Sequence, residues 1–251
     1  MAREREDSER SAQDGKAWFT TTHWSIVLDA AQKQSPTAEE ALNRLCTTYR
    51  KPLYNYVRQR GYSHEDAEDL IQKFFARLVE KDFLANVMPE KGRFRSFLLT
   101  AMSHFLANER DWANAQKRGG GVTPISLDAE PEEGGLAFEP ASNLTPEKLF
   151  DRSWATTLMD QAFADVREEY TKSGKAELFN QLSPFITEDS NYGDYGPVAK
   201  RLEMSENNLA VAVHRLKKSY RKSIRAQVTQ TVVSPADLEE EMKHLFVALT
   251  E

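Results

Sequence analysis

Residues 63–80 read SHEDAEDLIQKFFARLVE, which is the most regular helical pattern in the chain. Its apolar side chains recur at the spacing that gathers them on one stripe of a helix. The stripe consists of Ala67, Leu70, Ile71, Phe74, Phe75, Leu78 and Val79. Ser63 is placed to cap the N-terminus, and acidic residues fill the first turns, where the helix dipole favours negative charge. The stretch predicts an amphipathic helix with one core face.

The opposite face of this helix is polar. At about 100° per residue it collects Glu65, Asp69, Gln72, Lys73 and Glu80. Most charged helix faces are simply solvated and bind nothing. The alternative is that this face binds a partner.

Length and charge limit the function classes. The chain has 251 residues and a formal charge of -6, which argues against coating nucleic acid or an anionic membrane by electrostatics alone. Cys46 is the single cysteine, so an intramolecular disulfide and a cysteine cluster for zinc are both excluded. Neither a signal peptide nor a membrane-spanning run is evident, and we expect a cytoplasmic protein.

Composition divides the chain into segments. Residues 1–17 are mostly charged or small and predict a disordered N-terminus. Helical patterns fill residues 18–118 and again residues 146–230, whereas residues 119–145 are rich in Gly, Pro and acids and lack Lys and Arg. Residues 231–251 predict a C-terminal helical extension, which we expect to pack on the second domain. The predicted fold is all-α, with two helical domains joined by an acidic Gly- and Pro-rich linker.

A helical pattern beginning near residue 93 leaves basic, amide and aromatic side chains outside its apolar stripe or beyond its end. They are Arg93, Arg95, Asn108, Arg110, Trp112, Asn114, Lys117 and Arg118. Stacking a base on an aromatic ring is worth about 1 to 3 kcal/mol, and nearby cations hold phosphates, so this surface suits single-stranded DNA. The alternative is that Trp112 is a core residue of a long helix with a solvated basic face.

The run AEDLIQKFF at residues 67–75 resembles region 2 of the sigma-70 family, in its extracytoplasmic-function (ECF) branch. In that branch the matching helix docks on core RNA polymerase, which implies a polymerase-binding set here of Asp69, Leu70, Gln72 and Lys73. Lys73 stands where the family usually has Glu.

Residues 92–118 are similar to the family segment that reads and melts the minus-ten promoter element. The resemblance implies a minus-ten DNA-binding set of Arg93, Arg95, Asn108, Arg110, Trp112, Lys117 and Arg118. His104 and Asp111 depart from the family pattern, which commonly has Asn and a basic residue there.

Residues 197–228 carry a helix-turn-helix pattern. Residues 197–202 predict a short helix, residues 203–204 a turn, and Ser205 the N-cap of a helix from 206 to about 228. Small or apolar side chains occupy the positions where two such helices pack. These are Ala199, Leu202, Leu209, Val213 and Leu216. Six basic residues and no acid lie between residues 215 and 225. The alternative is an ordinary helical hairpin with a solvated basic end.

This segment resembles region 4 of sigma factors, which holds the minus-thirty-five element. Glu203 replaces the usual turn Gly, and Ala210 and Ala212 stand where the family commonly presents Lys and Arg to DNA. The resemblance then implies the DNA-binding residues Glu206, Asn207, Asn208, Val211, His214, Arg215, Lys217 and Lys218. Asparagines suit adenine edges. We expect weaker or altered promoter recognition.

No pattern for chemistry stands out in the sequence. The five histidines are scattered, and the glycines at 119–121 lack the Lys-Ser/Thr that a phosphate-binding loop needs. We therefore expect no enzyme, no metal and no cofactor.

The leading interpretation is an ECF-type RNA polymerase sigma factor whose partners are core RNA polymerase and promoter DNA, with no membrane. One alternative is a polymerase-independent helix-turn-helix regulator that binds duplex DNA alone. Another is a polymerase-binding interaction protein with weakened DNA reading. A regulatory partner, bound through the C-terminal extension, also stays open.

Overall fold

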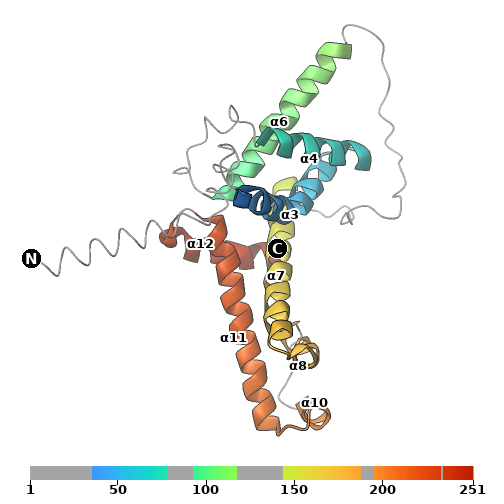
Figure 1. The fold of residues 1–251 in the computed structure, drawn as a ribbon. Helices are drawn as coiled ribbons and strands as arrows, with labels where there is room; N and C mark the ends of the chain where they lie inside the picture. The colour runs from blue at the N-terminus through green and yellow to red at the C-terminus, as the bar shows by residue number, and fades with distance from the viewer. Residues whose placement is uncertain (1–35, 79–92, 118–143, 188–194, 233, 251) are drawn as a thin grey trace, which may run out of the picture. The chain divides into compact units, whose positions relative to one another are not determined.

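The computed structural model describes residues 36–78, 93–117, 144–187, 195–232 and 234–250. Every element in these ranges is a helix, so the all-α prediction is confirmed (Figure 1). The helices are α3 (Pro36–Gln59), α4 (His64–Leu78), α6 (Phe94–Lys117), α7 (Pro146–Lys172), α8 (Ala176–Leu182), α9 (Pro184–Thr187), α10 (Tyr195–Arg201), α11 (Glu206–Thr231) and α12 (Pro235–Thr250). The predicted N-terminal tail and all but the end of the predicted linker lie outside the described residues.

The helix boundaries follow from local chemistry. α3 continues through Pro52, and Gly61 with a φ of 89° turns the chain after it, a backbone conformation that glycine adopts without strain. At the start of α4 the Ser63 hydroxyl accepts a hydrogen bond of 3.1 Å from the Asp66 amide. The Ser205 hydroxyl accepts one of 3.2 Å from the Asn208 amide at the start of α11. Both N-caps are as predicted from the sequence.

The chain divides into two compact units. Unit 1 comprises the chain up to Thr157 together with Thr229–Glu251, and unit 2 is Leu158–Val228. The division therefore falls inside α7 and α11 rather than in the predicted linker. The first turns of α7 belong to unit 1, where the buried Asn55 side chain of α3 donates a hydrogen bond of 3.1 Å to the Ser153 hydroxyl.

Aromatic side chains form much of the core of unit 1. Tyr49 of α3 meets Phe94 of α6 edge to face with ring centroids 5.4 Å apart, and Phe74 of α4 meets Phe105 of α6 at 5.7 Å. Such edge-to-face pairs add to the stabilisation that the buried area supplies. Burial is the main reason that the pKa of the Tyr49 hydroxyl lies above its usual range. The two pairs hold α6 against α3 and α4.

The C-terminal helix α12 belongs to unit 1. Its Glu241 accepts a hydrogen bond of 2.7 Å from Nε of Arg95 at the start of α6. The helix also contacts Asp151 through His244, within residues 146–230 that the sequence analysis assigns to the second domain. The ion pair with Arg95 of α6 is not predicted, because it joins two residues 146 positions apart, which helical periodicity alone does not reveal.

Unit 2 has its own hydrophobic core. Phe163 and Phe179 meet edge to face at 5.2 Å, and Phe185 and Tyr195 at 5.1 Å. The buried members of this core are Val166, Phe179, Leu182, Phe185, Tyr195, Ala199, Leu209, Val213 and Leu216. The packing positions predicted for the two helices at 197–228 are thus in the core, and Leu202 packs against it.

Candidate functional site

The α4 helix has the two faces that its sequence predicts. Ala67, Leu70, Ile71, Phe74 and Leu78 are buried, whereas Phe75 is only half-buried. Val79 and Glu80 lie outside the described residues. Glu65 and Asp66 occupy the first turn, where the free backbone N–H groups and the helix dipole favour acidic side chains.

The predicted polymerase-binding residues divide between these faces. Asp69, Gln72 and Lys73 are exposed, and none of them pairs with another side chain in the described part of the chain. Leu70 is 8 % exposed and belongs to the core. Three of the four residues can therefore contact a partner directly, and Leu70 supports the helix that presents them.

The α6 helix likewise separates a core face from an outer face. Phe94, Leu98, Met102, Phe105 and Leu106 are buried. Among the predicted DNA-binding residues, Asn108, Arg110 and Trp112 are exposed, and the Trp112 side chain is 62 % exposed. The alternative in which Trp112 is a core residue is wrong. Exposing so large an apolar ring to water is unfavourable. Contact of the Trp112 ring with a binding partner would therefore be favourable.

Two predicted DNA-binding arginines are engaged inside the protein. Arg95 is 5 % exposed and its guanidinium binds Glu241 and Asp151, each at 2.7 Å. Arg93 pairs with Glu240 and, at 3.0 Å, with Glu241. The expectation that Arg95 lies outside the buried stripe is wrong, because the buried Glu241 and the partly exposed Asp151 compensate its charge. The Lys117 side chain and Arg118 lie outside the described residues.

A pocket of about 450 Å³ connects the predicted polymerase face with the predicted DNA face, and we call it the α4–α6 pocket. Asp69 and Lys73 of α4 line it together with Arg110 and Trp112 of α6. Its wall holds three basic groups (Arg60, Lys73 and Arg110) and three carboxylates (Asp66, Asp69 and Glu109). This balance gives no net attraction for phosphate, so the pocket suits a polar, aromatic or mixed-charge group better than an anion.

In unit 2, three residues connect α10 to the N-cap of α11. Glu203 has a φ of 53°, the left-handed conformation that the usual turn Gly adopts without strain. The Met204 amide closes the turn by donating a hydrogen bond of 2.9 Å to the Ala199 carbonyl. The backbone at Glu203 is therefore strained, as expected where a residue with a Cβ replaces the usual glycine.

The predicted DNA-binding residues of α11 lie mainly on its outer face. Glu206, Asn207, Asn208, Val211, His214, Arg215 and Lys218 are exposed, and Lys217 is half-buried. Val211 is 49 % exposed, which is unusual for a β-branched aliphatic residue on a helix. This face combines amide, apolar and cationic groups, the types that contact base edges and phosphates.

Ala210 and Ala212 lie at the edge of that outer face. Both are half-buried and pack against the core of unit 2. Ala212 follows the buried Leu209 by three residues and the exposed Asn208 by four, and it lines a pocket together with Asn208 and Arg215. These alanines therefore contact the core, and Ala212 also borders the surface that carries the predicted DNA-binding side chains.

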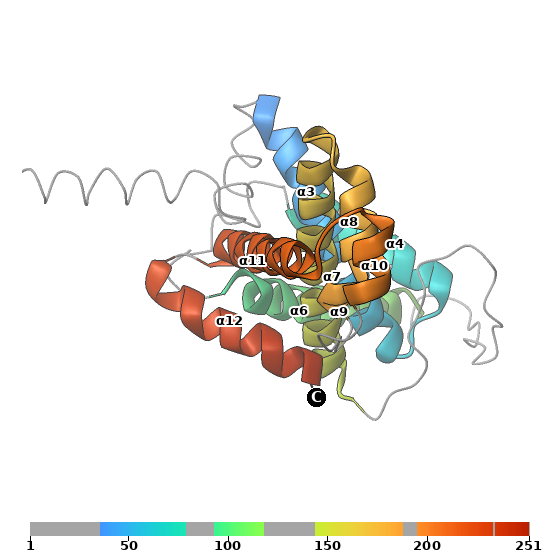
Figure 2. The same ribbon diagram turned by 90° about the horizontal axis from the view of Figure 1, so that it is seen from below.

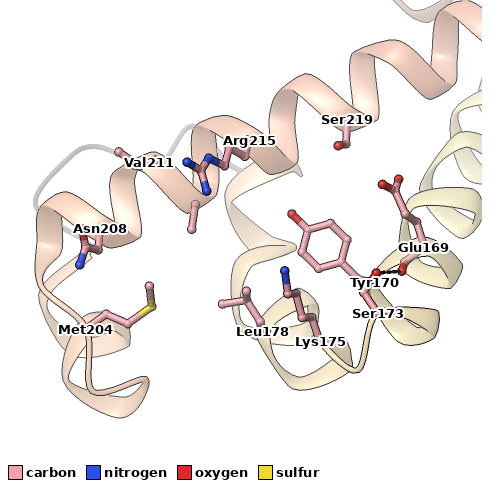
Figure 3. A pocket seen from close by; sticks show the side chains of 11 residues that line it. Glu169, Tyr170, Ser173, Lys175, Leu178, Met204, Asn208, Val211, Arg215 and Ser219 are labelled. Carbon is pink, nitrogen blue, oxygen red and sulfur yellow. Dashed lines mark hydrogen bonds between the residues drawn. The ribbon is translucent and has the colours of Figure 1, made fainter.

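A second pocket, of about 420 Å³, lies beside the outer face of α11, and we call it the α11 pocket. Asn208, Val211 and Arg215 line one side, and Tyr170 and Lys175 face them from α7 and the turn before α8 (Figure 3). Burial is the main reason that the pKa of the Tyr170 hydroxyl is raised, Glu169 raises it further, and Arg215 opposes the shift. The sequence analysis did not single out Tyr170 or Lys175, which only the tertiary structure brings beside α11.

Within the described residues, no group of three His, Cys, Asp or Glu side chains is placed to hold a metal ion. No described helix is long and apolar enough to cross a membrane.

A comparison with protein families found a match within the first unit. The family model for sigma-70 region 2 matches residues 45–110, which include α4 and α6 as far as Arg110. No curated protein and no solved structure matches the chain. Residues 45–110 are therefore similar to sigma-70 region 2.

Proposed function

We propose that the chain is an RNA polymerase sigma factor of the ECF type, acting in the cytoplasm. The observation that carries the proposal is the sigma-70 region 2 match at residues 45–110. Region 2 suggests binding to core RNA polymerase and promoter DNA, which is the work of a non-enzymatic initiation factor. The refinements below rest on the geometry of the matched helices and on the second unit.

Docking on polymerase is assigned to the exposed face of α4. Asp69, Gln72 and Lys73 are unpaired among the described residues, so binding a partner breaks no internal ion pair. Lys73 changes the charge pattern of this face relative to the Glu usual in the family. We expect the partner surface to place a carboxylate or a carbonyl near Lys73.

Opening of the minus-ten element is assigned to the end of α6. Trp112 offers an exposed ring for an unstacked base, and Arg110 and Asn108 on the same helix offer a cation and an amide. We leave Arg93 and Arg95 out of this role because carboxylates of α12 already bind both, and Asp151 of α7 also binds Arg95. The proposed DNA surface is therefore smaller than the one that the sequence analysis gives.

Contact with the minus-thirty-five element is assigned to α11. Asn208 and Val211 are exposed near its N-terminus, where a recognition helix reads base edges, and Arg215 and Lys218 follow as phosphate-binding groups. Lys175 lies across the α11 pocket and adds a cation from another element. Ala210 and Ala212 are half-buried against the core of unit 2, so we assign no base contact to them.

A polymerase-independent DNA-binding regulator is the second candidate. It is favoured by the exposed amide and basic residues of α11, which can bind duplex DNA without any partner. The two candidates differ in what the α4 face and Trp112 contribute.

Transcription from a library of promoter fragments separates the candidates. Core polymerase is supplied with or without the native chain, and both bound DNA and transcripts are sequenced. A sigma factor yields transcripts from a defined set of fragments only when both proteins are present. Fragments bound by the chain alone, with no gain in transcription, would support the independent regulator and contradict the sigma proposal.

A further inference from the structure

The Glu241 carboxylate of α12 is completely buried, with 0 % of the residue exposed. An ionised carboxylate in such a place is costly unless charged partners and hydrogen bonds compensate it. Arg95 supplies both, with its Nε 2.7 Å from Oε1 and its Nη2 3.4 Å from Oε2 of Glu241. Arg93 adds a third cationic contact, 3.0 Å from its Nε to Oε2. Glu241 is thus the centre of a two-arginine clamp on the start of α6.

A second set of contacts ties α12 to the first turns of α7. Nε2 of His244 lies 3.0 Å from Oδ2 of Asp151, and Oδ1 of the same carboxylate accepts a hydrogen bond of 2.7 Å from Arg95. The Arg95 guanidinium also lies 5.1 Å above the Trp154 ring, within cation–π range. Asp151 and Arg95 therefore connect α12, α6 and α7 in one network.

Apolar packing reinforces this network. Leu238, Leu245 and Ala248 of α12 are 0 to 8 % exposed. The ion pairs place α12 against the start of α6 and the first turns of α7, and Figure 2 shows these helices as neighbours. The C-terminal helix is thus attached along its length and not through one contact.

We propose that α12 is an intramolecular strap that holds the first turn of α6 through Glu241 and withholds Arg93 and Arg95 from nucleic acid. α6 is one helix from Phe94 to Lys117, so the element that holds its first turn also sets the direction in which it carries Trp112. The C-terminal segment is then an indispensable part of the unit that contains the region 2 match. The claim that α12 holds the start of α6 is independent of the proposed function. The claim that it withholds Arg93 and Arg95 from nucleic acid rests on that function.

The first test compares two neighbouring glutamates in the full chain. Glu241→Gln keeps the shape but removes the buried charge, and we expect the thermal unfolding midpoint to fall by roughly 10 °C. Glu240→Gln removes the exposed partner of Arg93, and we expect a change of no more than about 2 °C. Equal unfolding midpoints for Glu241→Gln and the native chain would contradict the proposal that Glu241 holds the first turn of α6.

A double substitution keeps the test decisive if Glu241→Gln folds poorly. Arg95→Met and Glu241→Met alone each leave a buried charge without its main partner, whereas the pair replaces both charges with apolar side chains of similar length. We expect the double variant to recover most of the midpoint lost in either single variant. Losses that simply add would show that the two residues are not coupled and would overturn the proposal.

Hydrogen exchange locates the effect. In Glu241→Gln we expect amides in the first two turns of α6 to exchange about tenfold faster, while amides of α11 between 206 and 216 keep their native rates. Equal acceleration in both places would mean a general loss of stability and would contradict a local strap.

The claim that α12 withholds Arg93 and Arg95 from nucleic acid has a separate test. It measures how tightly the full chain binds a single-stranded oligonucleotide. Arg93→Ala should leave the affinity and its salt dependence unchanged, whereas Arg110→Ala should lower both. A loss in Arg93→Ala as large as in Arg110→Ala would overturn the withheld-arginine claim. If neither variant nor the native chain binds while the thermal results hold, the proposed DNA role fails and the strap stands.

Discussion

Asp69 of α4 and Trp112 of α6 line the same pocket, so the predicted polymerase-docking face and the predicted base-stacking residue share one site. A group bound in the α4–α6 pocket contacts both helices. Polymerase docking and DNA opening are therefore expected to influence each other through this site, while substitutions at its two ends should separate the activities.

Substitution of Trp112 tests the DNA end of the pocket. Trp112→Ala removes a ring that stacks a base, which is worth about 1 to 3 kcal/mol, so opening of promoter DNA should fall roughly tenfold to a hundredfold. The measurement is permanganate reactivity of unpaired thymines in complexes with core polymerase. Trp112→Phe is the matched control and should keep most of the activity. Equal opening by the Ala variant would contradict the role given to Trp112.

The basic residues of α11 give a salt-dependent prediction. Arg215→Ala and Lys218→Ala should each weaken duplex binding about equally on all sequences and lower the salt slope by about one. The comparison is fluorescence anisotropy at several salt concentrations. Lys243→Ala changes an exposed lysine of α12 and should leave the slope unchanged. An unchanged slope in both α11 variants would remove this face from the DNA interface.

The turn between α10 and α11 is predicted to be strained at Glu203. Its φ of 53° is costly for a residue with a Cβ, so Glu203→Gly should raise the free energy of unfolding by about 0.5 to 1 kcal/mol. Urea unfolding of both chains provides the comparison. Glu203→Ala keeps the Cβ while removing the charge, and it should give no such gain. Equal stabilisation by both variants would assign the effect to charge instead.

The half-buried position of Ala212, between the core of unit 2 and the α11 pocket, leads to a contrast with its neighbour Val211. Ala212→Lys adds a long side chain where the alanine packs against the core, and it should destabilise unit 2 by about 1 kcal/mol. Val211→Lys alters an exposed position and should change stability by less than about 0.5 kcal/mol. Denaturant unfolding measures both. A harmless Ala212→Lys that also tightens DNA binding would restore the view that this position faces DNA.

Local patterns in the sequence predicted most of the helices and their caps. Ser63 and Ser205 cap the helices that their positions indicate, because capping depends on residues within one turn. The exposed face of α4 was equally readable from periodicity. The sigma-70 region 2 match at residues 45–110 agrees with the resemblance carried by residues 67–75 and by the part of residues 92–118 that ends at Arg110.

Contacts between residues far apart in the chain could not be predicted from the sequence. The local pattern predicts that Arg95 is exposed, and only the fold shows that Glu241 lies beside it. The same holds for Lys175, which only the packing of α7 and α8 brings next to α11.

Co-elution with bacterial core RNA polymerase is the most direct test of the central claim. The native chain should co-elute, and Asp69→Ala/Gln72→Ala should lose most of this binding without losing its fold. Asp160→Ala/Asn180→Ala changes an exposed carboxylate and amide of unit 2 and should bind like the native chain. Failure of the native chain to co-elute, or full binding by the α4 double variant, would contradict a sigma factor that docks through α4.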